Sequence, residues 1–321
     1  MMVVYKTYKY RVYPTREQVK QIELTFKMCA FVWNKFLERL TKAYRRRGES
    51  LTIFDCDHIL TQIKDYYPWL AQVDNKAMRC TIRNLFDAKK AFYRRLHAGE
   101  KPGYPRYKSE HNPVSSYTTN AVIHVTDDYI QLPKVKRLKY KRSRPIEGSI
   151  VEATVTRDVK GRYYVSICCA VEMEPLPTLD TSVTICRDDV DFAVDSNGMC
   201  YAQPENLDQQ YRRLRREVRR LHRMVPSSQN YQKQRQKVEG IYQHINNIQS
   251  DHRNKLVREI IRKNQVITVE AVDDARMRRD REYAEAVKKT AWREFIRALD
   301  YQARCTGREL VVAAPATLNA G

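Results

Sequence analysis

The sequence predicts an α+β protein of several domains, and three features of its hydrophobic pattern support this prediction. Apolar side chains recur at helical spacing from about residue 15 to residue 98. The period changes to two between residues 122 and 171, which is typical of strands. Beyond residue 177, short strands alternate with helical segments. At about 150 residues per domain, a chain of 321 residues is expected to form two or three domains.

The charge of the chain indicates a polyanionic partner. Lysine and arginine number 59 against 38 acidic residues, which gives a net charge of +21 and a pI near 9.6. Cations in such excess repel one another unless a partner neutralises them. Hydrophobic residues make up 42% of the chain, so wholesale disorder is excluded. No apolar run is long enough to span a membrane and the first ten residues lack a signal-peptide core, so we expect neither a membrane protein nor a secreted one.

The cysteines do not predict a metal site. The eight cysteines include no C-x-x-C pair, and the seven histidines lack the spacing of zinc ligands. We therefore interpret the cysteines as reduced thiols that pack as small core residues, and we expect no zinc.

The first third of the chain is predicted to be a strand followed by three helices. Residues 5–13 alternate aromatic or apolar with basic or polar side chains, as in a strand with one exposed cationic face. Thr15 and Gln18 have the spacing of a capping box, which begins a helix that continues to Gly48. Further helices are expected at residues 55–67 and at about 75–97. The prolines and glycines that follow them mark a boundary.

The next segment is predicted to consist of strands. Residues 151–156 and 163–171 flank a turn sequence, which is the pattern of a β-hairpin. Before it, residues 134–144 contain seven basic side chains and no acidic one. Such a strand is either an edge strand that its charge protects from aggregation or a strand that contacts phosphates. The net charge of the chain favours phosphate contacts.

The elements after residue 177 occur in the order of a ribonuclease-H-like α/β layer. Nucleases of this class cleave phosphodiesters with two divalent metals that are held by carboxylates at strand ends. The expected strands are at residues 182–186, 192–195, 199–202, 266–269 and 309–313, with a helical hairpin at 207–263 and a helix that carries Trp292, Phe295 and Leu299. Glu270 directly follows the fourth strand. The positions of the other carboxylates therefore decide whether this layer can cut.

The first helix of the hairpin is unusually rich in arginine. Leu214, Val218 and Leu221 predict its buried side. Planar guanidinium groups suit the clamping of phosphates, whereas a merely solvated helix face is the alternative. The outer side carries Arg212, Arg213, Arg215, Arg216, Arg219, Arg220 and Arg223.

A series of short strings resembles one known protein family over nearly the whole chain. The strings are YKYRVYPTREQ, FVWNKFL, GYPRYKS, SYTTN, IQLPKVKRLKYKRSRPIEG, GRYYVSI, DFAVDSNG, VITVE and AWREFIRALDYQARCTGRELVV, in this order. They resemble TnpB, the RNA-guided nuclease of insertion-sequence transposons and the ancestor of type V CRISPR effectors. One string alone would be weak, and the shared order makes the resemblance specific.

The resemblance implies a domain organisation. Residues 1–14 and 104–176 would form a wedge-type oligonucleotide-binding β-barrel, and residues 15–103 a helical recognition domain. Residues 177–321 would form a ribonuclease-H-like (RuvC-like) domain with a helical insertion at 207–263. Since the sequence ends at Gly321, we expect the zinc ribbon of the family to be lost.

The comparison with the family also implies a degenerate nuclease site. Where the family has the aspartate of a G-I-D-L-G strand, five residues before Asp191, this chain has Cys186. Glu270 matches the second metal-binding carboxylate, and the third, which lies beyond the zinc ribbon in the family, is expected to be absent. Magnesium prefers hard oxygen ligands and has little affinity for a thiol. We therefore expect no enzyme activity and no catalytic magnesium.

Neighbouring residues are not expected to rescue this site. Arg187 would add a repelling cation beside the metals. Asp188 and Asp189 would reach the site only through a register slip, which turns side chains to the other face. Asp273 and Asp274 are candidates only as loop residues.

The resemblance further implies the function of a TnpB-like nuclease-dead repressor (TldR). Such a protein binds a transposon-end-derived guide RNA, one protein per guide, and occupies double-stranded target DNA beside a short motif that the protein reads. We expect a cytoplasmic, nucleoid-associated bacterial protein. Two alternatives stay open, namely a residually active RNA-guided DNA endonuclease and a guide-RNA-binding remnant that does not target DNA.

Two sets of residues are candidates for nucleic-acid binding. For the motif, bidentate or thymine-methyl contacts suit residues that match the family positions, although Ile53 and Phe54 could be core and Thr118 a plain strand residue. This set is Thr52, Ile53, Phe54, Asn75, Lys76, Arg79, Ser116, Tyr117, Thr118, Thr119 and Asn120. The set for RNA or the guide–target heteroduplex is Lys134, Lys136, Arg137, Lys139, Lys141, Arg142 and Arg144, together with the seven arginines of the helix at 212–223.

Overall fold

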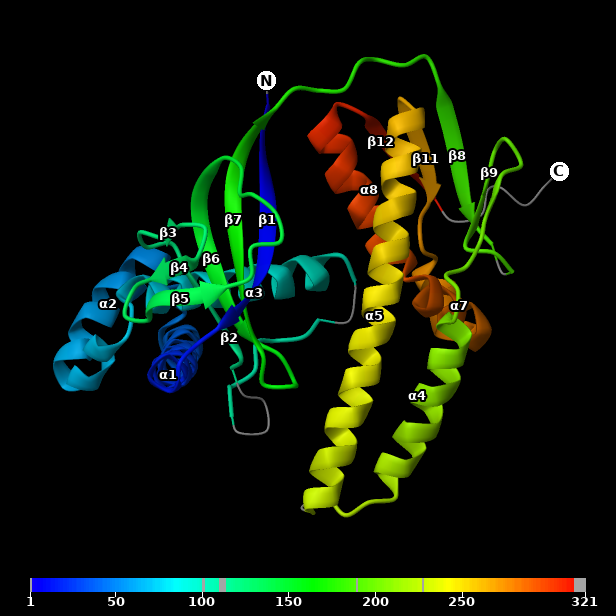
Figure 1. Cartoon of the computed structure of the whole chain (residues 1–321). Helices are drawn as coiled ribbons and strands as arrows, with labels where there is room; N and C mark the ends of the chain where they lie inside the picture. Colours follow the sequence, from blue (N-terminus) through cyan, green and yellow to red (C-terminus); the bar gives the residue numbers. More distant parts are fainter. Residues whose placement is uncertain (1, 100–101, 110–113, 189, 227, 315–321) are drawn as a thin grey trace. The chain divides into compact units, whose positions relative to one another are not determined.

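A computed structural model describes residues 2–99, 102–109, 114–188, 190–226 and 228–314 (Figure 1). The chain divides into two compact units by its internal contacts. One unit is Tyr5–Val171, and the other is Glu172–Gly321 together with Met1–Val4. The finer division of the first unit into barrel and helical domains remains a prediction.

Capping residues determine where the helices of the first unit begin and end. Strand β1 (Met2–Tyr13) leads into α1 (Arg16–Arg47), which begins at the Thr15–Gln18 capping box and ends at Gly48 in the left-handed conformation. Helix α2 (Ile53–Tyr66) begins two residues earlier than predicted, because Thr52 forms a second capping box with Asp55. A 3₁₀ helix (Pro68–Gln72) connects it to α3 (Asn75–His97), whose predicted bounds are confirmed.

These helices pack around one apolar core. Phe36, Leu60, Leu70, Ile82 and Leu85, from α1, α2, the 3₁₀ helix and α3, are almost fully buried in it. Burial of such large side chains stabilises the unit by about 1.5–3 kcal/mol each.

A seven-stranded sheet forms the rest of the first unit. Its order is β2-β6-β7-β1-β5-β4-β3. The basic strand β5 pairs with both β1 and β4, so the interpretation of this strand as a charge-protected edge is wrong. The bounds are β2 (Ser116–Thr119), β3 (His124–Val125), β4 (Tyr129–Leu132), β5 (Lys136–Tyr140), β6 (Ser149–Arg157) and β7 (Tyr163–Met173).

Gln18 joins the start of α1 to the turn that precedes β5. Its side-chain oxygen accepts a hydrogen bond from the Thr15 N–H at 3.0 Å. Its amide nitrogen donates to the carbonyl oxygens of Val135 and Arg137, at 3.2 and 2.7 Å. Lys134 and Lys136 in this turn have φ values of 62° and 65°, which are strained for residues other than glycine. The two hydrogen bonds from Gln18 therefore help to hold the left-handed backbone conformation, which is unfavourable for lysine.

The second unit contains the predicted α/β layer. Its five-stranded sheet has the order β10-β9-β8-β11-β12, in which β8, β9 and β10 are antiparallel while β11 and β12 run parallel to β8. Phe192, Trp292 and Phe295 lie at the centre of its core, to which α5 and α8 also contribute. The strands are β8 (Ser182–Arg187), β9 (Ala193–Asp195), β10 (Cys200–Tyr201), β11 (Val266–Glu270) and β12 (Glu309–Ala313).

The helices of the second unit include the predicted hairpin. Helices α4 (Leu207–His222) and α5 (Gln229–Lys263) pack side by side through Leu214, Val238 and Ile241 (Figure 1). Helices α6 (Asp274–Arg279) and α7 (Arg281–Thr290), which the sequence pattern did not predict, precede α8 (Trp292–Thr306). Among the described residues, no helix is long and apolar enough to cross a membrane.

Candidate nucleic-acid interface and candidate metal site

Cys186 and Glu270 lie side by side at the ends of two parallel strands. The register of β8 and β11 places Ile185 opposite Val269, so the next residue of each strand brings the thiol beside the carboxylate. Burial and the nearby charge of Glu270 raise the pKa of Cys186 above its usual range. The thiol is therefore protonated at neutral pH in the metal-free protein, and sulfur is in any case too soft a ligand to suit magnesium.

The other candidate carboxylates are held in turns and ion pairs. Asp188 accepts hydrogen bonds from the backbone N–H groups of Val190 and Asp191, both at 2.8 Å. Asp273 accepts the N–H of Arg276 at 2.9 Å, and Asp274 pairs with Arg293. Asp189 lies outside the described residues.

The residues at this site do not fit magnesium. Within the described part of the chain, no group of three or more His, Cys, Asp or Glu side chains could hold a metal ion. Two divalent ions about 3.5–4 Å apart need several oxygen ligands, whereas this strand pair offers one carboxylate and one neutral thiol. Arg187, which follows Cys186 in the sequence, adds positive charge near this pair. Its guanidinium group lies 4.9 Å from the ring centroid of Tyr283.

The arginines of α4 form an exposed row around a hollow. All seven predicted arginines are exposed, and Arg216, Arg219, Arg220, Arg223 and Met224 line a hollow of about 670 Å³. Guanidinium groups in such a row can hold successive phosphates of a nucleic-acid backbone.

A buried carboxylate fixes this row relative to α5. Glu217 accepts a hydrogen bond from Gln234 at 2.8 Å and pairs with Lys237 at 3.0 Å. The hydrogen bonds from Gln234 and Lys237 hold the pKa of Glu217 below its usual range. The one acid of this stretch of α4 therefore faces α5. Arg216 also lies 3.7 Å from Glu217, and Arg215 pairs with Glu285 at 3.6 Å, so the row keeps an excess of positive charge on its outer face.

The basic side chains of residues 134–144 also face solvent. All seven of them are exposed, while Val135, Leu138 and Tyr140 between them are buried. Arg137 stacks on Tyr129 at 4.7 Å from the ring centroid, and Arg144 stacks on Tyr8 at 4.9 Å. Arg142 pairs with Asp127. The strand therefore presents a cationic face in the middle of a sheet, where charge is not needed to protect an edge.

The motif candidates at the start of α2 are exposed. Thr52 caps the helix, and its hydroxyl donates to Asp55 at 2.7 Å. Ile53 is 38% exposed and Phe54 is 83% exposed, so the interpretation of these two as core residues is wrong. An exposed phenylalanine is available to contact bases or methyl groups.

The structure brings the candidates on α3 and β2 close together. Asn75 accepts a hydrogen bond from Lys64, and Arg79 pairs with Asp57 at 3.7 Å. Asn120, after β2, accepts a hydrogen bond from the thiol of Cys80 on α3 at 3.7 Å. The exposed members of this cluster are Asn75, Lys76, Ser116 and Asn120, with Arg79 and Thr118 half-buried.

Tyr117 and Thr119 have a structural role in place of the predicted base contacts. Tyr117 is buried against Phe26, with ring centroids 5.9 Å apart. Thr119 is fully buried, and its hydroxyl donates to Asp74, the capping residue of α3. Neither side chain is accessible to a base. The alternation of buried and exposed residues along β2 was the signal for this difference.

Replacing Thr119 with valine is expected to lower the free energy of unfolding by about 1.5–3 kcal/mol. Valine has no hydroxyl, so the buried carboxylate of Asp74 loses the hydrogen bond that Thr119 donates to it. Urea unfolding followed by circular dichroism measures this loss. Thr118→Val is the matched control, since it removes only the neutral Thr118–Thr154 hydrogen bond of 2.8 Å and should cost at most about 1 kcal/mol. Equal losses in both variants would contradict a special role for Thr119.

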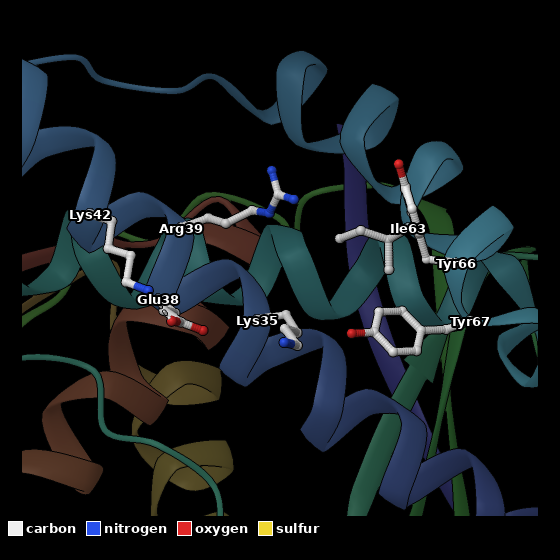
Figure 2. A pocket seen from close by; sticks show the side chains of 7 residues that line it. All are labelled: Lys35, Glu38, Arg39, Lys42, Ile63, Tyr66 and Tyr67. Carbon is white, nitrogen blue, oxygen red and sulfur yellow. Dashed lines mark hydrogen bonds and ion pairs between the residues drawn. The ribbon is translucent and has the colours of Figure 1, made fainter.

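One feature of the first unit was not predicted. Lysines and arginines follow one stripe of α1 at Lys35, Arg39, Lys42 and Arg46. The first three line a hollow against α2 (Figure 2), and Arg46 lines a second hollow beside it. Their spacing of four, three and four residues was a signal that this stripe shares one face.

Two family profiles match the chain. Residues 1–49 match the helix-turn-helix domain of IS605 OrfB proteins, and residues 167–281 match the profile described as "Probable transposase" of the same proteins. In this structure, the described residues of the first match form strand β1 and the single helix α1.

Two curated relatives match most of the chain, and a third matches a shorter part. A Streptomyces pristinaespiralis protein named "Putative RNA-guided DNA endonuclease" is 28% identical over 97% of this chain and 78% of its own length. The Escherichia coli protein InsQ, with the same description, is 23% identical over 83% of this chain, which spans 65% of that protein. The Salmonella dublin "Virulence protein VsdF" is 30% identical over 31% of this chain and 89% of its own length.

The fold is shared with a solved structure. One chain of the Cas12f1–sgRNA–target DNA complex matches 98% of this chain and 90% of its own length, with a TM-score of 0.58 and 11% identity. The profiles and the long sequence matches together assign this chain to the TnpB/IS605 OrfB family.

Proposed function

We propose that this protein is an RNA-guided, sequence-specific DNA-binding protein that does not cut DNA and represses transcription by occupying its target. The observation that carries the loss of cutting is the Cys186–Glu270 pair. A protonated thiol stands where the family has a metal-binding aspartate, and the nearby aspartates at 188, 273 and 274 are held in turns and ion pairs. Without bound metals, the attacking and leaving oxygens of a phosphodiester have no clamp.

Binding of a guide RNA is supported by relatives and by charge. The relatives from S. pristinaespiralis and E. coli are named RNA-guided enzymes. The exposed rows on β5 and α4 suit the backbone of an RNA or of an RNA–DNA heteroduplex, which proteins recognise by A-form geometry while base pairing supplies the sequence. The partners would be one guide RNA per protein and double-stranded DNA.

The cluster on α2, α3 and β2 supports recognition of a short DNA motif. Opening of a duplex must begin at a site that the protein itself recognises. Phe54, Asn75, Lys76 and Asn120 present exposed side chains for such contacts. A long heteroduplex beside this motif would block RNA polymerase without any chemistry.

The test begins with the RNA that copurifies with the protein from its host. We expect one discrete species with a constant scaffold and a 3′ segment that matches a promoter. The complex should bind that DNA, leave it uncut in magnesium and block transcription from it in vitro. Cys186→Asp should bind as the wild type does and still not cut, because it adds one oxygen ligand beside Glu270 and no further carboxylate joins that pair among the described residues.

Three outcomes would contradict the proposal in different ways. Magnesium-dependent cutting by the wild type would identify an active endonuclease, and cutting by Cys186→Asp alone would show that another carboxylate completes the site. DNA binding that does not depend on guide complementarity, measured with a scrambled guide segment as control, would identify an RNA-binding remnant.

A further inference from the structure

A hollow of about 410 Å³ lies between α1 and α2. Figure 2 shows Arg39 extending toward Ile63 and the hydroxyl of Tyr67 pointing toward Lys35. The lining is Lys35, Glu38, Arg39, Lys42, Ile63, Tyr66 and Tyr67. Its walls therefore combine three cations, one carboxylate, two aromatic rings and one apolar side chain. The cations can contact the phosphate of a nucleotide, and the rings can stack on its base.

The positive charge in this hollow is partly free. Lys42 pairs with Glu38 and holds the pKa of that carboxyl below its usual range. Glu38 is thus an anion that already has its partner. Arg39 makes no ion pair with another described residue, and Lys35 lies over the rings of Phe31 and Tyr67, at 5.7 and 5.9 Å from their centroids. Lys35 and Arg39 are therefore available to a phosphate.

The two tyrosines differ in packing and in access. Tyr67 is held edge-on against Phe31 and Trp69, with centroid distances of 5.1 and 5.6 Å. Tyr66 is 81% exposed and stands at the rim with its hydroxyl turned away from Tyr67 (Figure 2). An exposed ring beside cations is a platform on which any base can stack.

A second hollow continues the first along α1. It measures about 270 Å³, shares Arg39 and Lys42 with the first hollow, and adds Arg46 and Glu49. At a rise of about 1.5 Å per residue, Lys35 and Arg46 are about 16 Å apart along the helix. This distance corresponds to about five nucleotides stacked at the duplex rise of about 3.4 Å, and to fewer in an extended strand. The groove is therefore long enough for a strand and not only for a single nucleotide.

We propose that this α1–α2 groove binds one unpaired strand of nucleic acid, with phosphates on Lys35 and Arg39 and a base stacked on Tyr66. The inference rests on the proposed nucleic-acid function but adds a site that lies outside both sets of predicted contacts. The strand would run along α1 toward Arg46. DNA and RNA strands share this chemistry, and the test separates them.

The test measures binding of fluorescent 15-residue oligo-dT and oligo-U to the RNA-free, full-length protein at several salt concentrations. Lys35→Gln/Arg39→Gln should make the negative slope of log affinity against log salt shallower by about 1.4, because each lost phosphate contact with a single strand removes about 0.7 from its magnitude. Tyr66→Ala should weaken binding by about fivefold or more, while Tyr66→Phe should bind as the wild type does. The oligomer that shows the larger loss identifies the strand as DNA or RNA.

Two controls separate this groove from general attraction to a basic protein. Lys20→Ala/Lys27→Ala removes two exposed cations from α1 outside the groove and should leave the slope less affected. An abasic oligomer should bind Tyr66→Ala and wild type equally, since it has phosphates but no bases. Photocrosslinking with 4-thiothymidine or 4-thiouridine should label Tyr66 or Tyr67. Absence of this crosslink, together with groove variants that behave like the control pair, would overturn the inference and leave guided DNA binding untouched.

Discussion

Replacing Trp292 with alanine is expected to lower the free energy of unfolding by about 3–5 kcal/mol, more than any other single substitution considered for this protein. The indole is 1% exposed and packs against Phe192 and Phe295, with centroid distances of 5.6 and 5.0 Å. Its Nε1–H also donates to the carbonyl oxygen of Glu270 at 2.9 Å, so alanine would leave both a cavity and an unpaired buried acceptor. Urea unfolding followed by circular dichroism at 222 nm measures the loss.

Trp292→Phe separates the two contributions. It keeps much of the apolar packing and removes the hydrogen bond to Glu270, so we expect a smaller loss of about 1–2 kcal/mol. A loss below about 1.5 kcal/mol for Trp292→Ala would mean that the core around Phe192 can close over the gap.

Neutralising three arginines of α4 is expected to weaken the binding of an RNA–DNA heteroduplex on the order of a hundredfold at low salt. The variant is Arg219→Gln/Arg220→Gln/Arg223→Gln, whose side chains line the hollow on this helix. Each lost phosphate contact should also reduce the slope of log affinity against log salt by about one. A 20-base-pair hybrid of arbitrary sequence suffices, because contacts between arginines and phosphates do not depend on base sequence.

The control variant removes the same charge elsewhere. Arg235, Arg281 and Arg304 are exposed and each pairs with an acid four residues on or before, namely Glu239, Glu285 and Asp300. Their replacement by glutamine should change the affinity far less, since their charges are already partnered. Equal losses in the two triple variants would show that only the net charge matters and that the row on α4 is no binding surface.

Local signals in the sequence predicted many of the helix and strand limits correctly. Gly48 and the Thr15–Gln18 box determine the ends of α1, and both are visible as residue types at fixed spacing. Helix α2 began early because Thr52 and Asp55 form the same kind of box one step before the apolar pattern starts. Helices α6 and α7 were missed, because they are short and their caps, such as Asp280, lie within a run of charged residues.

Long-range pairing could not be predicted in the same way. Strand β5 lies inside its sheet because Val12 and Tyr13 of β1 pair with it, and no local pattern reveals a partner so distant in sequence. The burial of Tyr117 and Thr119 depends likewise on Phe26 and Asp74, which lie on or beside helices earlier in the chain.

The sequence predicted the parts of the candidate site that lie on single elements, and it missed the groove that two helices form together. Cys186 and Glu270 were identified from their match to the metal-binding positions of the family, and the parallel register of β8 and β11 brings the two side chains together. The exposed arginines of α4 followed from helical periodicity alone. The α1–α2 groove was not found, because a groove needs two elements and the sequence shows only the cationic stripe of one.

Gln18 has two structural roles, and they couple two parts of the chain whose sequences could otherwise change independently. The residue caps α1 and, more than a hundred positions away, clamps the turn that aims Lys134 and Lys136. If Gln18 is replaced during evolution, both the N-terminal cap of α1 and the support for lysines in the left-handed conformation are lost. Glycine at positions 134 and 136 would adopt that conformation without support, but the two positive charges would be lost. Residues 18, 134 and 136 are therefore expected to covary among related proteins, although one lies on a helix, one in a turn and one at the start of a strand.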